Sequence, residues 1–153
     1  MKPDFVMVLH IVLLVTGLVG LLFSVAAACV YLIESRQLKT KRVGSGLFLK
    51  LPSLEALDRR HYASLFFGVI LFSFGVFIGF FSTSDSASLH KVLKEPQSLL
   101  VILVCLLYWV ILGARITALR RGQKIAIGTL LVFLLLVLTV AGSGGLAGFH
   151  KGP

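Results

Sequence analysis

Four long apolar stretches alternate with shorter polar ones along the chain, and this pattern predicts its secondary structure. The stretches are residues 5–33, 62–81, 98–116 and 125–141. Each is close to, or longer than, the roughly 20 residues that a helix needs to cross the hydrocarbon core of a bilayer. Because a membrane-spanning backbone must satisfy its own hydrogen bonds, we expect helices rather than strands. The sequence therefore predicts an all-α bundle of four transmembrane helices, one membrane domain over residues 1–153.

The polar segments are a connection over residues 34–61, a loop over 82–97 and a tail over 142–153. In the first of these, the stretch Leu51–Asp58 predicts a short interfacial helix that Ser53 caps. The tail is rich in glycine, which favours the end of the last helix near its start. The tail is then either flexible or turned back over the bundle.

Composition agrees with a membrane protein, because 58% of the 153 residues are hydrophobic and only 14% are charged. The net charge of +9 follows the predicted topology and does not require a nucleic-acid partner. Eleven Lys and Arg residues fall on one side of the predicted membrane and four on the other. The eleven are Arg36, Lys39, Lys41, Arg42, Lys50, Arg59, Arg60, Arg115, Arg120, Arg121 and Lys124, and the four are Lys2, Lys91, Lys94 and Lys151. The positive-inside rule then places both termini outside, on the periplasmic side of a bacterial inner membrane.

Motifs of soluble enzymes are absent from the sequence. It has no glycine-rich phosphate loop, no serine-hydrolase elbow and no zinc-protease helix motif. No acidic residue falls in the middle of a predicted span, which argues against a proton or ion pathway. Cys29 and Cys105 lie inside apolar stretches without metal-ligand spacing, which indicates small buried residues.

The four histidines are the polar residues whose positions are the most informative about function. His10 lies a turn or two inside the first predicted helix, where an imidazole is costly unless it has a partner or a use. The predicted topology places His10, His90 and His150 on the outer side and His61 on the cytoplasmic side. The polar surroundings of His90 indicate a solvated loop residue, and the position of His61 indicates a helix-start or headgroup residue.

Small residues follow His10 along one stripe of the first helix and recur on the second. The stripes carry His10, Gly17, Ser24 and Tyr31 on the first helix, and Ser64, Gly68, Gly75, Gly79 and Ser82 on the second. Close packing of the two helices is the interpretation that this pattern favours. The alternative is that small residues such as Gly17 leave room beside His10 for a flat, bulky ligand.

Three stretches of the chain resemble one family of membrane proteins. The segment Leu51–Tyr62 is similar to the cytoplasmic LPSLExLDRxxY stretch of the cytochrome c assembly, or haem-handling, family of the CcsA, CcmC and HemX type. The long helix that follows His10 resembles the start of the conserved core of that family. The segment Leu146–His150 resembles its closing LxGxH motif. The likeness covers nearly the whole chain but only the C-terminal half of a full family member.

The resemblance implies a haem site on the outer face. It assigns His10 and His150 as a pair of axial ligands to one haem b, with both residues acting as the metal ligands. Lys91, Lys94 or Lys151 would then meet the propionates. One departure is large, because the tryptophan-rich loop of the family is missing from residues 82–96, which contain no tryptophan.

These patterns together predict a haem-b-binding membrane protein that handles haem or transfers electrons within a larger membrane complex. The expected partners are the lipid bilayer, other membrane subunits and a periplasmic c-type cytochrome, and no nucleic acid. The missing loop argues against a haem-attachment enzyme acting on its own. The alternative function is a structural or scaffolding subunit without a cofactor.

Overall fold

The structure is a computed structural model that describes residues 3–39, 53–82, 96–117 and 122–149. Those residues form four helices, α1 (Pro3–Lys39), α2 (Leu54–Ser82), α4 (Pro96–Thr117) and α5 (Gln123–Phe149). Each helix is long and apolar enough to cross a membrane. The prediction of an all-α chain with four membrane-spanning helices is therefore confirmed.

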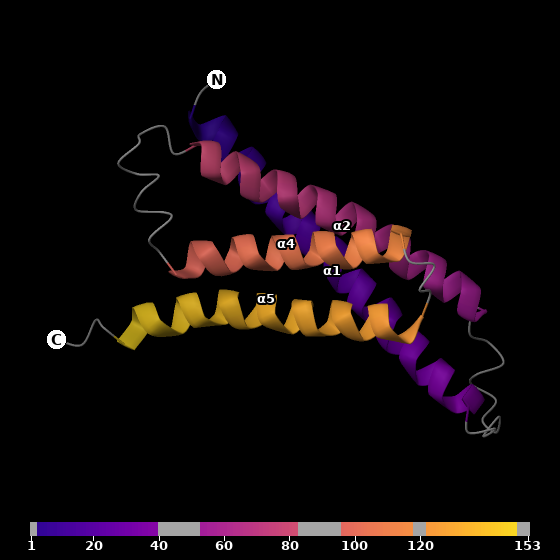
Figure 1. Ribbon diagram of the computed structural model, residues 1–153. Helices are drawn as coiled ribbons and strands as arrows, with labels where there is room; N and C mark the ends of the chain where they lie inside the picture. Colours follow the sequence, from indigo (N-terminus) through magenta and orange to yellow (C-terminus); the bar gives the residue numbers. More distant parts are fainter. Residues whose placement is uncertain (1–2, 40–52, 83–95, 118–121, 150–153) are drawn as a thin grey trace.

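The helices pack as two antiparallel pairs (Figure 1). Helix α1 lies along α2, while α4 and α5 form the second pair, which crosses the first obliquely. The pairs are joined by contacts of α1 with α5 and of α2 with α4. As a result, the start of α1, the end of α2, the start of α4 and the end of α5 all lie at the left-hand end of Figure 1.

Glycines set the close approach of α1 and α2. A Cβ atom on Gly17 would lie 2.7 Å from the Cα atom of Phe72, and one on Gly20 would lie 3.0 Å from the Cα atom of Gly68. Neither space holds even a methyl group, so the two backbones are in direct contact. The packing interpretation of the small-residue stripes is thus confirmed, and close backbone packing is the main attraction available between helices in lipid.

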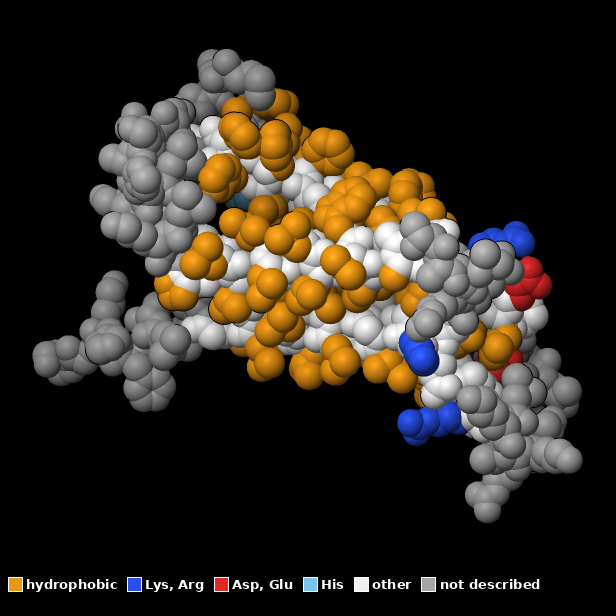
Figure 2. All heavy atoms as spheres, viewed as in Figure 1, with side chains coloured by type: hydrophobic (Ala, Val, Ile, Leu, Met, Phe, Trp, Pro, Cys, Tyr) orange, Lys and Arg blue, Asp and Glu red, His pale blue; other side chains and the backbone are white. Residues whose placement is uncertain are grey.

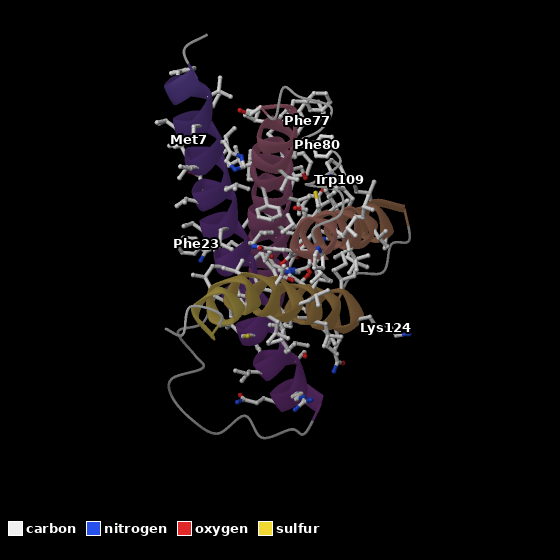
Figure 3. All side chains as sticks on the ribbon, turned by 90° about the vertical axis from the view of Figure 1, so that its left-hand side faces the viewer. Met7, Phe23, Phe77, Phe80, Trp109 and Lys124 are labelled. Carbon is white, nitrogen blue, oxygen red and sulfur yellow. The ribbon has the colours of Figure 1, made fainter. Side chains whose placement is uncertain are left out.

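The core lies between the two pairs, and the outside of the bundle is apolar. The buried residues of this core are Leu21, Leu65, Val69, Phe72, Val104, Tyr108, Leu112, Val132 and Leu136. Large hydrophobic side chains also cover the middle of the surface, whereas charged ones gather at the end where α2 begins (Figure 2). Met7 and Phe23 project from the side of α1 that faces away from α2 (Figure 3). Such a surface suits a lipid environment.

Two boundaries differ from the sequence prediction. The expected interfacial helix over Leu51–Asp58 is not separate within the described residues, because α2 begins at Leu54 and continues without a break through the second span. The predicted cap is present, since the Ala56 amide donates to Ser53 Oγ at 3.4 Å. Helix α5 continues through the glycines to Phe149, although those glycines predicted an end near Ala141.

Candidate functional site

The imidazole of His10 is fixed against α2. Its Nδ1 atom lies 2.7 Å from the carbonyl oxygen of Gly75. A carbonyl oxygen only accepts, so Nδ1 carries the proton, and a neutral ring then keeps a lone pair on Nε2. The hydrogen bond to Gly75 thus occupies Nδ1 and leaves Nε2 as the nitrogen that can accept or ligate. The polar residue in the first span therefore has one satisfied nitrogen and one available nitrogen.

Gly79 makes room for this ring. A Cβ atom at residue 79 would lie 2.8 Å from Nδ1 of His10 and 3.1 Å from Nε2. The imidazole thus occupies the space that a side chain on α2 would fill. Gly75, one turn earlier, faces Leu14 instead, where a Cβ atom would meet the leucine side chain at 2.8 Å.

His10 lines a pocket of about 510 Å³ at the left-hand end of the bundle, to which all four helices contribute. Its lining residues are His10, Leu14, Val15, Leu18, Phe72, Val76, Gly79, Phe80, Gln97, Ser98, Val101, Ile102, Leu136 and Val140. The wall is apolar except at His10 and at Gln97 and Ser98, which open helix α4. Phe80, labelled in Figure 3, closes the α2 side. Apolar walls with a few convergent polar groups are typical of small-molecule and cofactor sites.

The other predicted site residues are placed differently. Gly17 lies at the backbone contact with Phe72, so it acts on the pocket only through the spacing of α1 and α2. His150 follows the last described residue of α5 and lies outside the described residues, as do His90 and the lysines at positions 91, 94 and 151. Val140 lines the pocket, and a straight helix from there to Phe149 extends about 14 Å further.

A second polar cluster lies at the opposite end of the bundle. Arg115 of α4 forms an ion pair with Asp58 of α2, with its Nη2 atom 2.6 Å from Oδ2, and it also donates to the Asp58 carbonyl at 3.1 Å. Both side chains are largely buried, 9% and 17% exposed. The guanidinium also lies 5.0 Å from the centre of the Tyr62 ring, within cation–π range. This cluster joins the two helix pairs.

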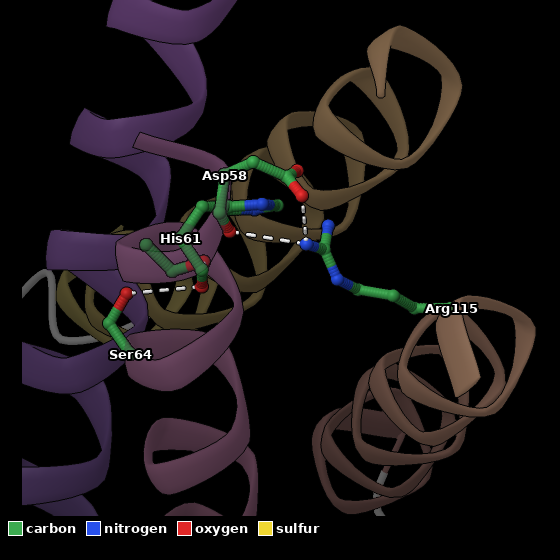
Figure 4. Close-up of polar contacts among 5 residues, drawn as sticks. Asp58, His61, Ser64 and Arg115 are labelled. Carbon is green, nitrogen blue, oxygen red and sulfur yellow. Dashed lines mark hydrogen bonds and ion pairs between the residues drawn. The ribbon is translucent and has the colours of Figure 1, made fainter. Parts of the chain in front are cut away.

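His61 belongs to this second cluster and is only 2% exposed (Figure 4). The hydroxyls of Ser24 and Ser64 both donate to its backbone carbonyl, at 3.4 and 3.2 Å. Its ring atom Nε2 is buried without a hydrogen-bond partner among the described residues. The sequence interpretation of His61 as a helix-start or headgroup residue is therefore wrong, because α2 starts earlier and its buried face passes through residue 61.

The sequence held a signal that would have found this cluster. Leu57, His61, Leu65, Gly68 and Phe72 recur at three- and four-residue spacing and form the buried face of α2. Asp58 and Tyr62 lie next to that face, one turn apart, and Arg115 lies in the last turn of its own helix. Extending the apolar face of α2 back by two turns would have placed His61 inside.

Metal chemistry based on clustered protein ligands finds no support in the described ranges. They contain no group of three or more His, Cys, Asp or Glu residues that could hold a metal ion. Cys29 and Cys105 are free thiols, half-buried in their helices. Cys105 contacts the hydroxyl of Ser73 at 3.2 Å, and the Trp109 indole donates to the same hydroxyl at 3.0 Å. These contacts join α2 to α4.

Comparisons with known proteins bear on what the pocket holds. No curated protein and no solved structure matches the chain. The family described as cytochrome C assembly protein matches residues 1–150, which is nearly the whole chain and includes both His10 and His150. This confirms the resemblance that the sequence motifs indicated. The chain with its pocket beside His10 belongs to the cytochrome c assembly protein family, a family that handles haem.

Proposed function

We propose that this chain binds one haem b in the pocket beside His10, with His10 and His150 as the axial ligands. The observation that carries the proposal is the environment of the His10 ring. Its Nδ1 donates a hydrogen bond to the Gly75 carbonyl, and the ring lines a pocket of about 510 Å³. A neutral imidazole held through one nitrogen offers the other to iron, and two such ligands give a six-coordinate haem.

The residues of the pocket suit a flat, largely apolar macrocycle with two acidic groups. The volume falls within the range of about 300–1,000 Å³ that small-molecule and cofactor sites occupy. Leu14, Phe72 and Leu136 present apolar side chains from three helices. Gln97 and Ser98 supply hydrogen-bond donors on one side, where carboxylates would be stabilised. We propose that Lys91, Lys94 or Lys151 adds positive charge there.

The proposed second ligand requires a change at the end of α5. A straight α5 carries its last described residue, Phe149, beyond the pocket, whereas iron ligation needs the His150 ring within bonding distance of the same haem. The last turns of α5 contain four glycines, Gly142, Gly144, Gly145 and Gly148. Glycine weakens a helix by roughly 1 kcal/mol relative to alanine, so these turns bend more easily than the rest of α5.

The proposed orientation follows from the charges. The described charged side chains gather at the end of the bundle opposite the pocket (Figure 2). The positive-inside rule assigns that end to the cytoplasm, which puts the pocket and both termini on the periplasmic side of a bacterial cytoplasmic membrane. There the site is accessible to other membrane subunits and to a periplasmic c-type cytochrome.

The proposed role is haem handling or electron transfer as part of a larger membrane complex. When bound, haem supplies an iron that changes between the ferric and ferrous states. The chain positions it, shields it from water with apolar side chains and holds one ligand. The absence of the tryptophan-rich segment makes haem attachment by this chain alone a poor fit. A midpoint potential and a haem dissociation rate distinguish a fixed redox centre from a cargo site.

A cofactor-free structural subunit is the second candidate, and one observation favours it. The hydrogen bond from His10 to Gly75 by itself satisfies half of the imidazole and ties α1 to α2. In this role the free nitrogen would have no function and the pocket would hold lipid chains.

The test is a haem titration of the purified full chain in lipid nanodiscs. We expect a low-spin spectrum at a stoichiometry of one, lost in His10→Ala and in His150→Ala. His90→Ala is the matched control and should keep the wild-type spectrum. A well-folded wild-type protein that leaves added haem with its free spectrum would support the structural subunit instead. Identical spectra in the two ligand variants and the wild type would exclude the ligand assignment.

A further inference from the structure

We infer that Gly75 and Gly79 form a backbone seat that fixes the tautomer and the direction of the His10 ring, which makes Gly79 a positioning residue for the axial ligand. The inference rests on the proposed function, since it names what prepares His10 for iron. It adds that the ligand is set by α2 before any haem arrives, through a carbonyl oxygen and a missing side chain.

The carbonyl of Gly75 selects the tautomer. As part of α2, this oxygen already accepts from the backbone amide of residue 79, one helical turn later. A carbonyl oxygen has two lone pairs, so it can also accept from Nδ1 of His10 at 2.7 Å. A backbone oxygen cannot become a donor, and the proton therefore stays on Nδ1. The hydrogen bond leaves Nε2 as the ligating atom and fixes the orientation of the ring, as outer-shell partners of metal-bound histidines do.

The missing side chain of Gly79 allows this geometry. Any Cβ atom at residue 79 would lie 2.8 Å from Nδ1 and 3.1 Å from Nε2 of His10, distances at which the ring must move. Moving the ring away from α2 breaks the bond to Gly75 and frees the imidazole to rotate. Gly75 itself faces Leu14, so the two glycines have different roles. Gly75 supplies the hydrogen-bond acceptor, and Gly79 supplies the space for the ring.

Two other glycines provide matched controls. A Cβ atom on Gly68 would lie 2.8 Å from the Leu21 amide nitrogen, so Gly68→Ala separates α1 from α2 without adding an atom beside His10. A Cβ atom on Gly113 of α4 would meet nothing within 4 Å, so Gly113→Ala should leave the structure unchanged. Gly68→Ala thus reports the effect of looser helix packing alone, and Gly113→Ala the effect of an added helix-forming residue.

The first measurement needs no haem. Nitrogen magnetic resonance of histidine-labelled protein in nanodiscs reports which ring nitrogen of each histidine carries the proton, and His10→Gln assigns the signal. We expect His10 to be protonated at Nδ1, with a hydrogen-bonded shift, in the wild type and in Gly113→Ala, and to lose that shift in Gly79→Ala. A His10 ring protonated at Nε2 in the wild type would overturn the inference that Gly75 and Gly79 fix the tautomer.

The second measurement uses haem titration and redox potentiometry. Gly79→Ala should weaken haem binding about 10- to 100-fold, the usual effect of losing an outer-shell partner, and shift the spectrum toward high spin. Added imidazole should restore the low-spin bands, because it replaces the displaced ring. Gly68→Ala should melt at a lower temperature yet stay low-spin. A Gly79→Ala protein with wild-type affinity, spectrum and potential would overturn the inference, whereas a wild type that binds no haem would overturn the proposed function and leave the tautomer result standing.

Discussion

The two histidines that the structure describes lie toward opposite ends of the bundle and differ in what surrounds their rings. His10 is half-buried, donates through Nδ1 to a backbone carbonyl and borders an open pocket. His61 is 2% exposed, lies beside the Asp58–Arg115 ion pair and has a buried Nε2 without a partner among the described residues. Among the described residues, the ring of His10 borders a pocket that a ligand could enter, whereas the ring of His61 is buried among the helices.

The comparison teaches that an unused nitrogen is not by itself a ligand. A free imidazole nitrogen becomes useful when the other nitrogen fixes the ring and when there is room for the metal and its macrocycle. His61 is only 2% exposed, and the polar groups nearby tie helices together. Under the proposed function, the pocket end holds the haem, and the cluster around His61 ties the helices together.

The largest expected effect tests the structural end. Arg115→Ala removes the partner of a largely buried carboxylate and the cation stacked on Tyr62. Breaking a buried ion pair by removing one member costs about 3–5 kcal/mol, because the other charge stays buried and unpaired. We expect a loss of that size in the free energy of unfolding, measured by denaturant titration in micelles, with little change in haem affinity.

Two further variants make this result specific. Lys124→Ala removes an exposed cation near the same end and should change stability by less than about 0.5 kcal/mol. Replacing both partners, Asp58→Asn with Arg115→Met, should recover part of the loss, since no unpaired charge remains. If Arg115→Ala were as mild as Lys124→Ala, the cluster would not hold the bundle together.

A smaller effect is expected at the pocket end, where the proposed ligation by His150 requires α5 to bend. The double change Gly144→Ala and Gly145→Ala strengthens the helix by roughly 1 kcal/mol per residue. If haem binding requires these turns to open, the added preference of about 2 kcal/mol lowers haem affinity about 30-fold. Haem titration measures this, and circular dichroism checks that helix content rises or stays constant.

The matched control for that prediction is Gly128→Ala in the first half of α5. Its added Cβ atom would make an ordinary contact of 3.6 Å with Ile111, far from the chain end. It should leave haem affinity unchanged. An unchanged affinity in the double variant as well would mean that the ligand partner of His10 does not come from the end of α5.

The fold was predictable because hydropathy determines it. Four apolar stretches and the bilayer thickness give four helices, and the small-residue stripes gave the contact of α1 with α2 at Gly17 and Gly20. The end of α5 was not predictable in this way. Glycine is a helix breaker in water, but a bilayer leaves backbone groups without other partners and so favours continued helix. Helix α2 extends back to Leu54 for a different reason, because Leu57 and His61 in its first turns are buried against the rest of the bundle.

The candidate site was predictable only in part. His10 stood out because a single imidazole inside an apolar helix needs a reason. Its partner on α2 could not be predicted, because the acceptor is the backbone oxygen of Gly75. Gly79 contributes only the space that its missing side chain leaves. His61 was misread because its neighbours in sequence are charged, although its neighbours on the helix face are Leu57 and Leu65. Contacts between helices decide such cases, and the pattern of one helix does not contain them.

The smallest expected effect separates the two histidines directly. His61→Leu replaces a ring with an unpartnered buried nitrogen by an apolar side chain of similar size, on a face that already carries Leu57 and Leu65. The bonds from Ser24 and Ser64 go to the backbone carbonyl of residue 61 and are retained. Unpartnered polar groups cost about 1–3 kcal/mol when buried, so stability should stay within about 1 kcal/mol or rise.

The outcome of His61→Leu carries weight because the alternatives predict more. If Nε2 of His61 bound a ligand, His61→Leu would remove that contact. The variant would then show lower stability or weaker haem binding. His61→Ala provides the size control, since it leaves a cavity beside Leu65 and should be less stable than the leucine variant. Equal haem spectra in the wild type and in His61→Leu, beside a lost spectrum in His10→Leu, would assign ligand chemistry to the pocket end alone. Loss of the low-spin spectrum in His61→Leu would instead make the buried ring part of the haem site and end the division between the two regions.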